Sequence, residues 1–395
     1  LYGKGTTTVD ATQTLIRNGG LGIVGCIILP VGRTGESDRM FIRNWGADAW
    51  TVTGGAATDR IGFYSDGGAN NNISNYISFK GITFNQINSS GVSNAEAGGV
   101  GYFKSGGVGI NIEECDFSNI NGGTNTSAAN LYGVEGAKIW RRCTANTIQV
   151  NGSSTNGNAG GLCLYYSSDK FSIQRCEIQT AGVGIYPKRP LGIAPVVRFC
   201  KIDDCNKAMD FGFGSSGHEL DYLCVQNNLF ENCTDVSALD FRAPAPTAAG
   251  RSLISNNVFD ACGRDNNTGA LKIQNIYETL VYNNIFINCS KEWGIPALQF
   301  QSNTNRDVFE YADFNLAFNL SANRYIYLGT QYATSSALNA VASAFAGNDT
   351  LTNPLFNGAA TDDYTLQAGS PALTGGVDGT QQGLYLGNFY TIGAN

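Results

Sequence analysis

Three charged residues occupy the same position in three short, otherwise apolar segments. Each is the middle residue of an apolar–variable–apolar triplet: Asp210 in 209–211, Asp240 in 239–241 and Lys272 in 271–273. In a strand with one buried face, the middle residue of such a triplet points outward. If the three strands are stacked neighbours, two carboxylates and an amine form one outward row with steps of ~4.8 Å.

Two kinds of chemistry fit this row. In glycoside hydrolysis, one carboxylic acid protonates the leaving oxygen and a second carboxylate activates water or attacks the sugar; Asp210 and Asp240 are the candidate pair. In β-elimination, a base removes the proton beside a uronate carboxylate while a cation stabilises the enediolate. Lys272 or Lys188 is the candidate base, and Arg242 or Ca²⁺ the candidate cation. The alternative is a surface ladder of opposite charges that adds little energy and performs no chemistry.

Other residues near the row are candidates for holding a glycan. Tyr165 and Tyr186 offer flat surfaces on which sugar rings dock, and Gln299 follows Lys272 in the row. The same alignment adds further outward positions, at Cys163, Gly184 and Tyr327. His218, the single histidine, lies in the adjoining loop and is a weaker candidate for a general base.

Composition excludes several classes of protein. Among the 395 residues, 14% are charged, 42% are apolar and 50 are Gly. The 18 Tyr, 21 Phe and 4 Trp argue against disorder, and the scarcity of helix-favouring stretches argues against a helical bundle. A net charge of −7 argues against a nucleic-acid partner. The longest apolar run, residues 21–31, is too short to span a bilayer and contains a proline.

A repeat of about 29 residues runs through the chain. Its clearest copies are VQNNLFENC, ISNNVFDAC and VYNNIFINC, at 225–233, 254–262 and 281–289. The second Asn marks an anchor column, and apolar or small residues recur three before, two after and five after each anchor. The anchors are Ile82, Cys115, Cys143, Cys176, Cys200, Asn228, Asn257, Asn284 and Ala312. One coil of this kind cannot bury its own face, whereas stacked coils bury a continuous core.

This pattern resembles the right-handed parallel β-helix superfamily, which includes pectate-lyase-like, alginate-lyase-like and phage tailspike-like proteins. The likeness covers roughly residues 25–330, and the Asn pairs resemble the asparagine ladder of that superfamily. Residues 353–373 resemble the closing segment of many secreted bacterial β-helix proteins, with Asn353 where Asp is usual. The expected fold is therefore an all-β, right-handed parallel β-helix of about ten to twelve coils with a cap at each end.

We expect three parts in this fold. Residues 1–75 form an N-terminal cap and the first coils, 76–330 form the repeats, and 331–395 form a C-terminal closing segment. Within the last part, residues 335–347 carry the apolar spacing of a short helix that covers the final coil.

The repeat gives the eleven cysteines a structural role. Eight of them fall into two columns: Cys115, Cys143, Cys176 and Cys200 in one, and Cys205, Cys233, Cys262 and Cys289 in the other. Stacked buried thiols behave as small hydrophobes, so we predict unpaired packing cysteines rather than disulfides or a metal site. Asn228, Asn257 and Asn284 are predicted to satisfy buried backbone groups.

Two functions remain open. The first is an extracellular or virion-associated protein that binds a polysaccharide, with cleavage by a hydrolase or lyase reaction as an open question. The second is a non-catalytic structural β-helix, such as a phage spike, a head decoration or a surface fibre. The resemblance implies Ca²⁺ as a candidate cofactor, and a homotrimer or other virion or surface proteins as candidate partners.

Overall fold

The structure is a computed structural model in which most of the chain is described. The described residues are 2–3, 5–8, 14–16, 22–24, 27–28, 39–44, 49–55, 61–66, 76–89, 98–123, 126–135, 137–150, 152–153, 159–165, 168–188, 191–212, 223–233, 238–242, 252–263, 269–274, 279–289, 298–301, 309–320, 325–328, 330–341 and 347–384. The chain divides into two compact units, unit 1 (Leu1–Ile193) and unit 2 (Ala194–Asn395). His218 lies outside the described residues.

Unit 1 winds through three parallel sheets in turn. Its first sheet contains β1 (Tyr2–Gly3), β6 (Met40–Asn44), β9 (Ile77–Lys80), β12 (Ile110–Glu113), β15 (Lys138–Arg141) and β18 (Ser168–Gln174). Its second sheet contains β2 (Gly5–Thr8), β7 (Trp50–Thr53), β10 (Ile82–Ser89), β13 (Asp116–Gly122), β16 (Thr144–Val150) and β19 (Glu177–Gln179). Its third sheet contains β5 (Ile27–Ile28), β8 (Phe63–Asp66), β11 (Val100–Val108), β14 (Thr126–Glu135), β17 (Ala159–Tyr165) and β20 (Val183–Lys188). A separate antiparallel pair is formed by β3 (Thr14–Ile16) and β4 (Gly22–Val24).

Unit 2 repeats this arrangement. Its first sheet contains β21 (Leu191–Arg198, which begins just before the unit boundary), β24 (Leu223–Gln226), β27 (Ser252–Ser255), β30 (Thr279–Tyr282) and β33 (Phe309–Asp313). Its second sheet contains β22 (Lys201–Asp203), β25 (Leu229–Glu231), β28 (Val258–Asp260), β31 (Ile285–Ile287) and β34 (Leu316–Phe318). Its third sheet contains β23 (Lys207–Gly212), β26 (Leu239–Arg242), β29 (Leu271–Gln274), β32 (Leu298–Gln301) and β35 (Tyr325–Tyr327), with β36 (Thr330–Tyr332) antiparallel at the end.

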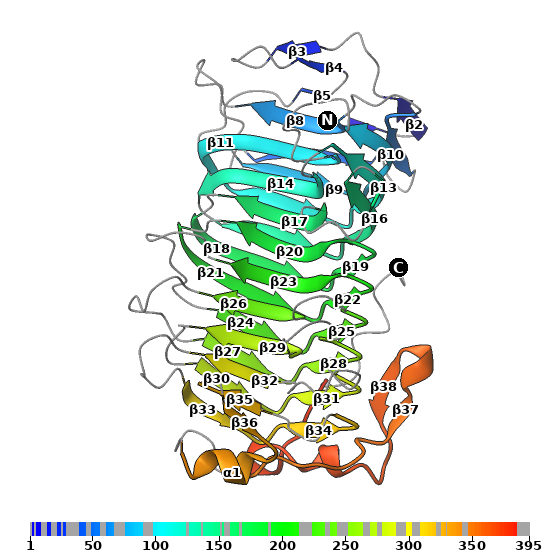
Figure 1. Ribbon diagram of the computed structural model, residues 1–395. Helices are drawn as coiled ribbons and strands as arrows, with labels where there is room; N and C mark the ends of the chain where they lie inside the picture. Colours follow the sequence, from blue (N-terminus) through cyan, green and yellow to red (C-terminus); the bar gives the residue numbers. More distant parts are fainter. Residues whose placement is uncertain are drawn as a thin grey trace. The chain divides into compact units, whose positions relative to one another are not determined.

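Within each unit the strands of a sheet stack in chain order, so the protein is an all-β parallel solenoid (Figure 1). The predicted fold class is therefore confirmed. We expected ten to twelve coils in a single solenoid. The described strands give about five coils in each compact unit. The end of unit 2 carries the short helix α1 (Ser335–Asn339) and the antiparallel hairpin of β37 (Phe356–Gly358) and β38 (Asp363–Leu366). Single turns of 3-10 helix cover 359–361, 371–373 and 377–379.

Each coil bends at residues with positive φ. The bend between a first-sheet strand and the following second-sheet strand places one residue at φ 53°, 56° and 56° in three successive coils of unit 2: Asn227, Asn256 and Asn283. Asn enters this left-handed region more readily than most side chains. The first Asn of each pair therefore makes the bend, and the second is left to point inward.

The predicted Phe column lies inside unit 2. Phe230 pairs in register with Phe259, and Phe259 with Phe286. Their ring centroids are 5.0 and 4.6 Å apart along the column, and all three side chains are fully buried. Phe84 and Phe117 stack in the same way in unit 1, at 4.8 Å. These stacked rings confirm that the offset two residues after the anchor faces the core.

The second Asn of each pair forms a continuous ladder in the core of unit 2. Asn228 Nδ2 donates to Asn257 Oδ1 at 3.0 Å, Asn257 Nδ2 to Asn284 Oδ1 at 2.9 Å, and Asn284 Nδ2 to Asn315 Oδ1 at 3.0 Å. These side-chain amides also form hydrogen bonds with buried backbone N–H and C=O groups of neighbouring coils. The predicted structural role of the paired Asn is therefore confirmed.

The ladder also corrects the predicted register of the last coil. We aligned Ala312 with Asn284, whereas the structure places Asn315 there, because Ile285 pairs with Leu316. An amide at this position extends the hydrogen bonds of the ladder, which an alanine cannot do. The apolar spacing alone did not distinguish the two alignments.

Two alignments in the third sheet are also wrong. Cys163 pairs with Tyr186 rather than Gly184, and Gln299 pairs with Ile326 rather than Tyr327. A shift of two residues leaves the same face of the strand outward, so the alternation of apolar and polar residues does not distinguish Gly184 from Tyr186 as the partner of Cys163. The second error reversed the faces, because Tyr327 is 7% exposed and points inward while Ile326 takes the outward place.

Ten of the eleven cysteines fall in the described part of the chain, and all ten are buried. Burial raises the pKa of the Cys115, Cys233 and Cys289 thiols well above the ordinary value. The prediction of packing cysteines is confirmed for these ten, and Cys26 lies outside the described residues.

We expect these thiols to resist modification in the folded protein, because the reactive thiolate is both inaccessible and disfavoured. Treatment of the native protein with Ellman's reagent is expected to modify no more than one thiol per chain. The same measurement in guanidinium chloride is expected to count all eleven. Fast modification of several thiols in the native protein would contradict the stacked arrangement.

Candidate functional site

The third sheet of unit 2 carries the charged row that the sequence predicts. Asp210 on β23 pairs with Asp240 on β26, Asp240 pairs with Lys272 on β29, and Lys272 pairs with Gln299 on β32. These four residues thus lie on consecutive strands and in register. Two carboxylates and one amine are neighbours at the spacing of stacked strands, ~4.8 Å.

A second lysine completes the cluster, and the sequence analysis missed it. Lys207 begins β23, and its Nζ lies 2.7 Å from Asp210 Oδ2 and 3.9 Å from Asp240 Oδ2. Only 14% of the Lys207 side chain is exposed, against 11% for Asp210 and 0% for Asp240. We name Lys207, Asp210, Asp240 and Lys272 the charged row. The sequence signal was a lysine three residues before Asp210, which a search for outward strand positions overlooks.

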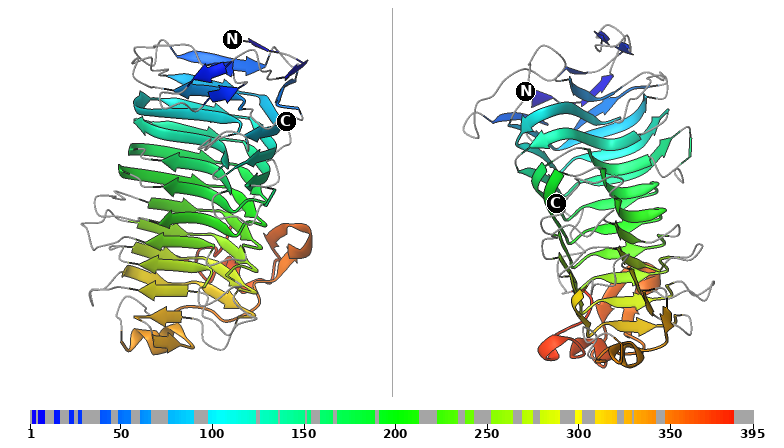
Figure 2. Two further views of the ribbon diagram at one scale, coloured as in Figure 1. Left: turned by 45° about the horizontal axis from the view of Figure 1, so that its top comes forward. Right: turned by 60° about the vertical axis from the view of Figure 1, so that its left-hand side comes forward.

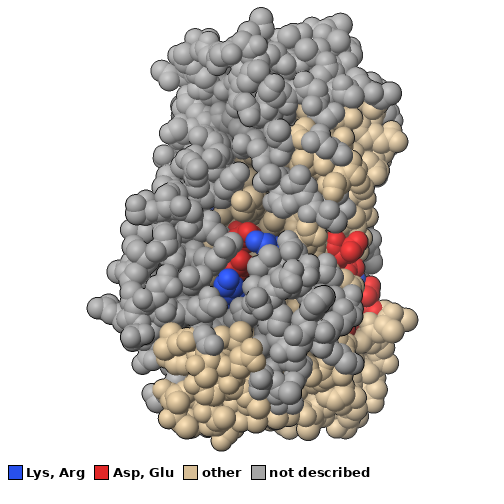
Figure 3. Space-filling model, viewed as in Figure 1, with Lys and Arg blue, Asp and Glu red and all other residues tan. Residues whose placement is uncertain are grey.

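The charged row balances two negative and two positive side chains. Basic and acidic atoms lie side by side on the face of the molecule that Figure 3 shows. Removing several charges from water costs several kcal/mol for each ion, and pairing only partly repays that cost. A well-packed apolar set would therefore stabilise this part of the fold at least as well. Such a cluster in a chain with 14% charged residues is an indication of a role beyond stability.

The geometry favours some of the proposed chemical roles over others. The Oδ2 atoms of Asp210 and Asp240 both lie within 4 Å of the Lys207 ammonium group. The two carboxylates are therefore closer together than the pair in most inverting glycosidases, where the carboxyl groups are ~6.5–9.5 Å apart. This spacing suits a retaining pair or a simple ion cluster. The candidate bases for β-elimination are Lys272 and Lys188, and of these two Lys272 lies in the row, paired with Asp240.

The remaining predicted residues lie outside the charged row. Arg242 follows the row at the end of β26, where it pairs with Gly212 and Gln274. Tyr165, Tyr186 and Lys188 belong to strands β17 and β20 of unit 1, where Tyr165 pairs with Lys188. Tyr165 and Tyr186 were expected to share one row; Tyr186 instead pairs with Cys163.

A second polar cluster lies on the second sheet of unit 2, under the C-terminal hairpin. The hydroxyl oxygen of Tyr364, on β38, lies 2.5 Å from Glu231 Oε1 and 2.7 Å from Asp260 Oδ2. Lys201 Nζ lies 3.0 Å from Glu231 Oε2 and 2.7 Å from Asp362 Oδ2. This cluster joins the hairpin to strands β22, β25 and β28.

The hydroxyl group of Tyr364 lies between two carboxyl groups in this second cluster. A phenol has a single proton to donate, so the other short contact of Tyr364 requires a proton on a carboxyl group. Burial raises the pKa of Glu231 although Tyr364 and Lys201 oppose that shift. Burial, with Asp260 and Glu231 beside it, also raises the pKa of Tyr364. Burial lowers the pKa of Lys201, but its contacts with Asp362 and Glu231 outweigh burial and raise it. Tyr364, Glu231 and Lys201 thus form one polar network in which the pKa of each group depends on its neighbours.

Apolar packing holds the hairpin over this cluster. The outward position just after the anchor is polar in unit 1, with Thr83, Asp116, Thr144 and Glu177. In unit 2 it is Lys201 in the first coil and apolar in the next four, with Leu229, Val258, Ile285 and Leu316. These side chains pack against Tyr364, Leu366, Ala372 and Leu384 of the C-terminal segment. Figure 2 shows the orange hairpin beside the yellow-green strands. Each buried aliphatic side chain contributes about 1.5–3 kcal/mol.

Comparison with known proteins adds no family. The chain matches no model of a known protein family, and no curated protein sequence is significantly similar to it. Among the described residues, no group of three or more His, Cys, Asp or Glu side chains is arranged to hold a metal ion. In the same part of the chain, no helix has the length and apolar character needed to cross a membrane.

Proposed function

We propose that the protein binds a polysaccharide through the charged row on the third sheet of unit 2, in an extracellular or virion setting. The observation that supports this proposal is the burial of Asp210 and Asp240 beside Lys207, in register with Lys272. A glycan offers hydroxyl and carboxylate groups that such a set of donors and acceptors recognises. Stacked strands repeat these groups along one direction, which suits an extended polymer.

The resemblance to the pectate-lyase-like and tailspike-like β-helix superfamily points to the same class of ligand. In that reading, Asp210 and Asp240 would supply the carboxylates of a hydrolase, or Lys272 the base of a lyase. A fold does not by itself decide function, so the weight rests on the charged row rather than on the solenoid.

A binding assay with matched variants tests the proposal. We expect the chain to bind at least one member of a panel containing alginate, polygalacturonate, hyaluronan, xylan and dextran. Lys272→Ala is expected to weaken binding tenfold or more, about 1.4 kcal/mol, because it removes a charged contact. Asp240→Asn is expected to have an effect of the same size, because the buried Asp240 carboxylate helps to hold the Lys207 ammonium group in place. Affinity electrophoresis or calorimetry measures the change.

The control for this assay is Asp204→Asn. Asp204 is exposed and has a φ of 49°, a conformation that Asn adopts readily, so this variant removes a charge without straining the backbone. Its binding is expected to equal that of the original chain. The proposal fails if no polymer binds, or if all three variants bind equally well.

Catalysis is tested on the same polymers. Cleavage would release reducing ends, and elimination would also produce unsaturated uronates that absorb in the ultraviolet. Loss of release in Asp240→Asn, with binding partly retained, would assign this carboxylate a chemical role. If no product forms from any bound polymer, the protein is a binding protein rather than an enzyme.

The second candidate is a non-catalytic structural solenoid, such as a spike, decoration or fibre, with a homotrimer or other surface proteins as partners. The direct ion pairs of Lys207 favour it, since a cluster whose charges are paired internally needs no ligand. Unchanged behaviour of Asp240→Asn in every glycan assay would select this alternative.

A further inference from the structure

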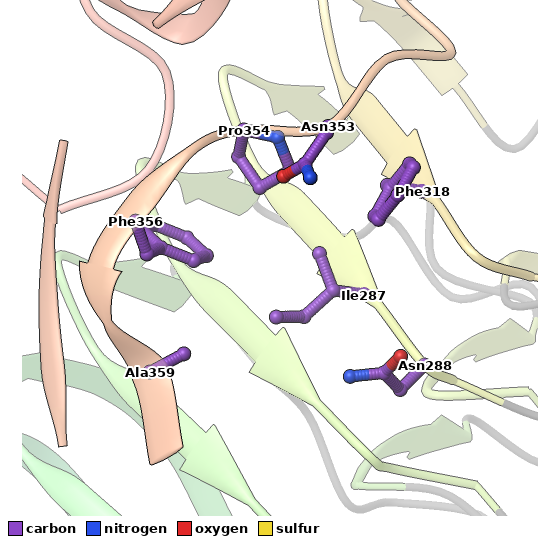
Figure 4. A pocket seen from close by; sticks show the side chains of 7 residues that line it. All are labelled: Ile287, Asn288, Phe318, Asn353, Pro354, Phe356 and Ala359. Atoms are coloured by element: carbon purple, nitrogen blue, oxygen red, sulfur yellow. The ribbon is translucent and has the colours of Figure 1, made fainter. Parts of the chain in front are cut away.

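A small pocket lies between the second sheet of unit 2 and the C-terminal segment. It has a volume of about 180 Å³ and is lined by Ile287, Asn288, Phe318, Asn353, Pro354, Phe356 and Ala359. Figure 4 shows these side chains around one space, with Phe356 and Ala359 on one side, Phe318 and Asn288 on the other, and Ile287 between them. At ~30 Å³ for each water, the pocket has room for roughly six waters.

The lining combines apolar walls with two carboxamides and contains no charged side chain. A few polar groups in a mainly apolar concavity are the usual composition of a small-molecule site. The absence of a cation or carboxylate from the lining disfavours a charged ligand, because its charge would be desolvated without a partner. The geometry therefore points to a neutral ligand that has both an apolar face and hydroxyl groups.

The two carboxamides are held in fixed orientations. Asn288 Nδ2 donates to Asp260 Oδ1 at 2.8 Å, and Asn288 Oδ1 accepts from Asn319 Nδ2 at 2.6 Å. Asn353 Oδ1 accepts from the Leu355 backbone N–H at 2.9 Å. A carboxamide has two donor hydrogens and two acceptor sites, so these contacts fix each group while leaving it capacity for a ligand.

Asn288 also connects the pocket to the polar cluster of Tyr364, Glu231 and Asp260. Its partner Asp260 accepts from Tyr364 through the other carboxylate oxygen. Groups with displaced pKa values beside a pocket are a recognised sign of a functional site. The pocket is thus bordered by an ordered polar network on one side and by two aromatic rings, Phe318 and Phe356, on the others.

We propose that this pocket binds a single neutral sugar ring, as a second glycan contact of unit 2 on a different sheet from the charged row. The C–H face of a pyranose would lie against Phe318 or Phe356, and its hydroxyl groups would bond Asn288 and Asn353. The choice of a sugar among neutral ligands rests on the proposed function. A ligand of this size is expected to bind with a Kd on the order of 1 mM.

The test uses the full chain and neutral monosaccharides as probes: glucose, galactose, mannose and N-acetylglucosamine, with glucuronate as the charged comparison. Ligand-observed NMR is expected to detect at least one neutral sugar and to detect no glucuronate. Asn353→Asp retains the acceptor for Leu355 but adds a negative charge to the lining, and it is expected to weaken binding tenfold or more. Phe318→Ala, which removes one wall, is expected to do the same.

Asp240→Asn separates this inference from the proposed function. It should leave monosaccharide binding unchanged while weakening polymer binding, because Asp240 belongs to the other sheet. The inference is overturned if no neutral sugar binds at 20-fold the expected Kd, if glucuronate binds as well as the neutral sugars, or if Asn353→Asp binds like the original chain. Cyclohexanol is included as an apolar probe of similar size. If it binds while none of the sugars does, the inference is also overturned and the pocket is one for apolar ligands.

Discussion

Asn257→Ala is expected to destabilise unit 2 by roughly 4 kcal/mol or more. Asn257 is fully buried and makes four hydrogen bonds in the ladder. It donates to Val225 O and Asn284 Oδ1, both at 2.9 Å, and accepts from the backbone N and the Nδ2 of Asn228, both at 3.0 Å. Alanine would leave these partners buried without hydrogen bonds, and each such loss costs about 1–3 kcal/mol. Urea unfolding followed by circular dichroism measures the change.

Asn146→Ala provides the comparison for this variant. Asn146 is exposed on β16, where its Nδ2 donates to Gln179 Oε1 at 3.5 Å and its Oδ1 accepts from the Thr147 hydroxyl at 2.9 Å. Its replacement is expected to change stability by less than about 0.5 kcal/mol, as is usual for surface positions. A destabilisation of Asn257→Ala below about 1 kcal/mol would show that the ladder contributes packing rather than essential hydrogen bonds.

Asp349→Asn is expected to remove a large pH dependence of stability. Asp349 ends the Asn ladder, where it accepts from the Asn315 backbone N–H at 2.8 Å and from the Tyr325 hydroxyl. Burial raises the pKa of Asp349 from 3.8 to about 7, with nearby Asp313 acting in the same direction and the bonds from Tyr325 and Asn315 opposing it. The folded state therefore binds a proton more tightly than the unfolded state.

The sign of the effect follows from this difference. Between about pH 4 and pH 7 the folded chain holds more protons at this site, so its free energy of unfolding falls as the pH rises. The loss reaches up to about 4 kcal/mol above pH 7, at 1.36 kcal/mol for each pKa unit. Asn keeps an acceptor for Asn315 and has no proton to lose, so the variant should gain stability relative to the original chain as the pH rises.

The difference in unfolding free energy between the two chains, measured by urea unfolding from pH 4 to pH 8, isolates this group from other carboxylates. The control Asp204→Asn removes an exposed carboxylate and is expected to show a flat difference over the same range. If Asp349→Asn is less stable than the original chain at pH 8, the buried carboxylate is ionised at little cost and the interpretation is wrong.

The sequence was sufficient to predict the interior of this solenoid. The spacing of Phe230, Phe259 and Phe286, of the paired Asn and of the stacked Cys predicted which positions face inward, because each coil repeats one backbone path and places equivalent side chains over one another. The same repetition predicted that Asp210, Asp240 and Lys272 lie on consecutive strands. Where the repeat weakens, the prediction failed. At Gly184 a shift of two residues keeps the same face outward, and at Ala312 both alignments place apolar or small residues two and five positions after the anchor.

The exterior of unit 2 was decided by the tertiary structure. Nothing local to Leu229, Val258 or Ile285 shows that the C-terminal segment covers them, although their apolar character at an outward position indicates that something does. The contacts of Tyr364 with Glu231 and Asp260 span 133 and 104 residues. Repetition within a coil fixes the positions of neighbours along the solenoid, whereas the docking of a non-repeating segment depends on the summed packing and charge of a whole surface, and these exist only once the coils are stacked.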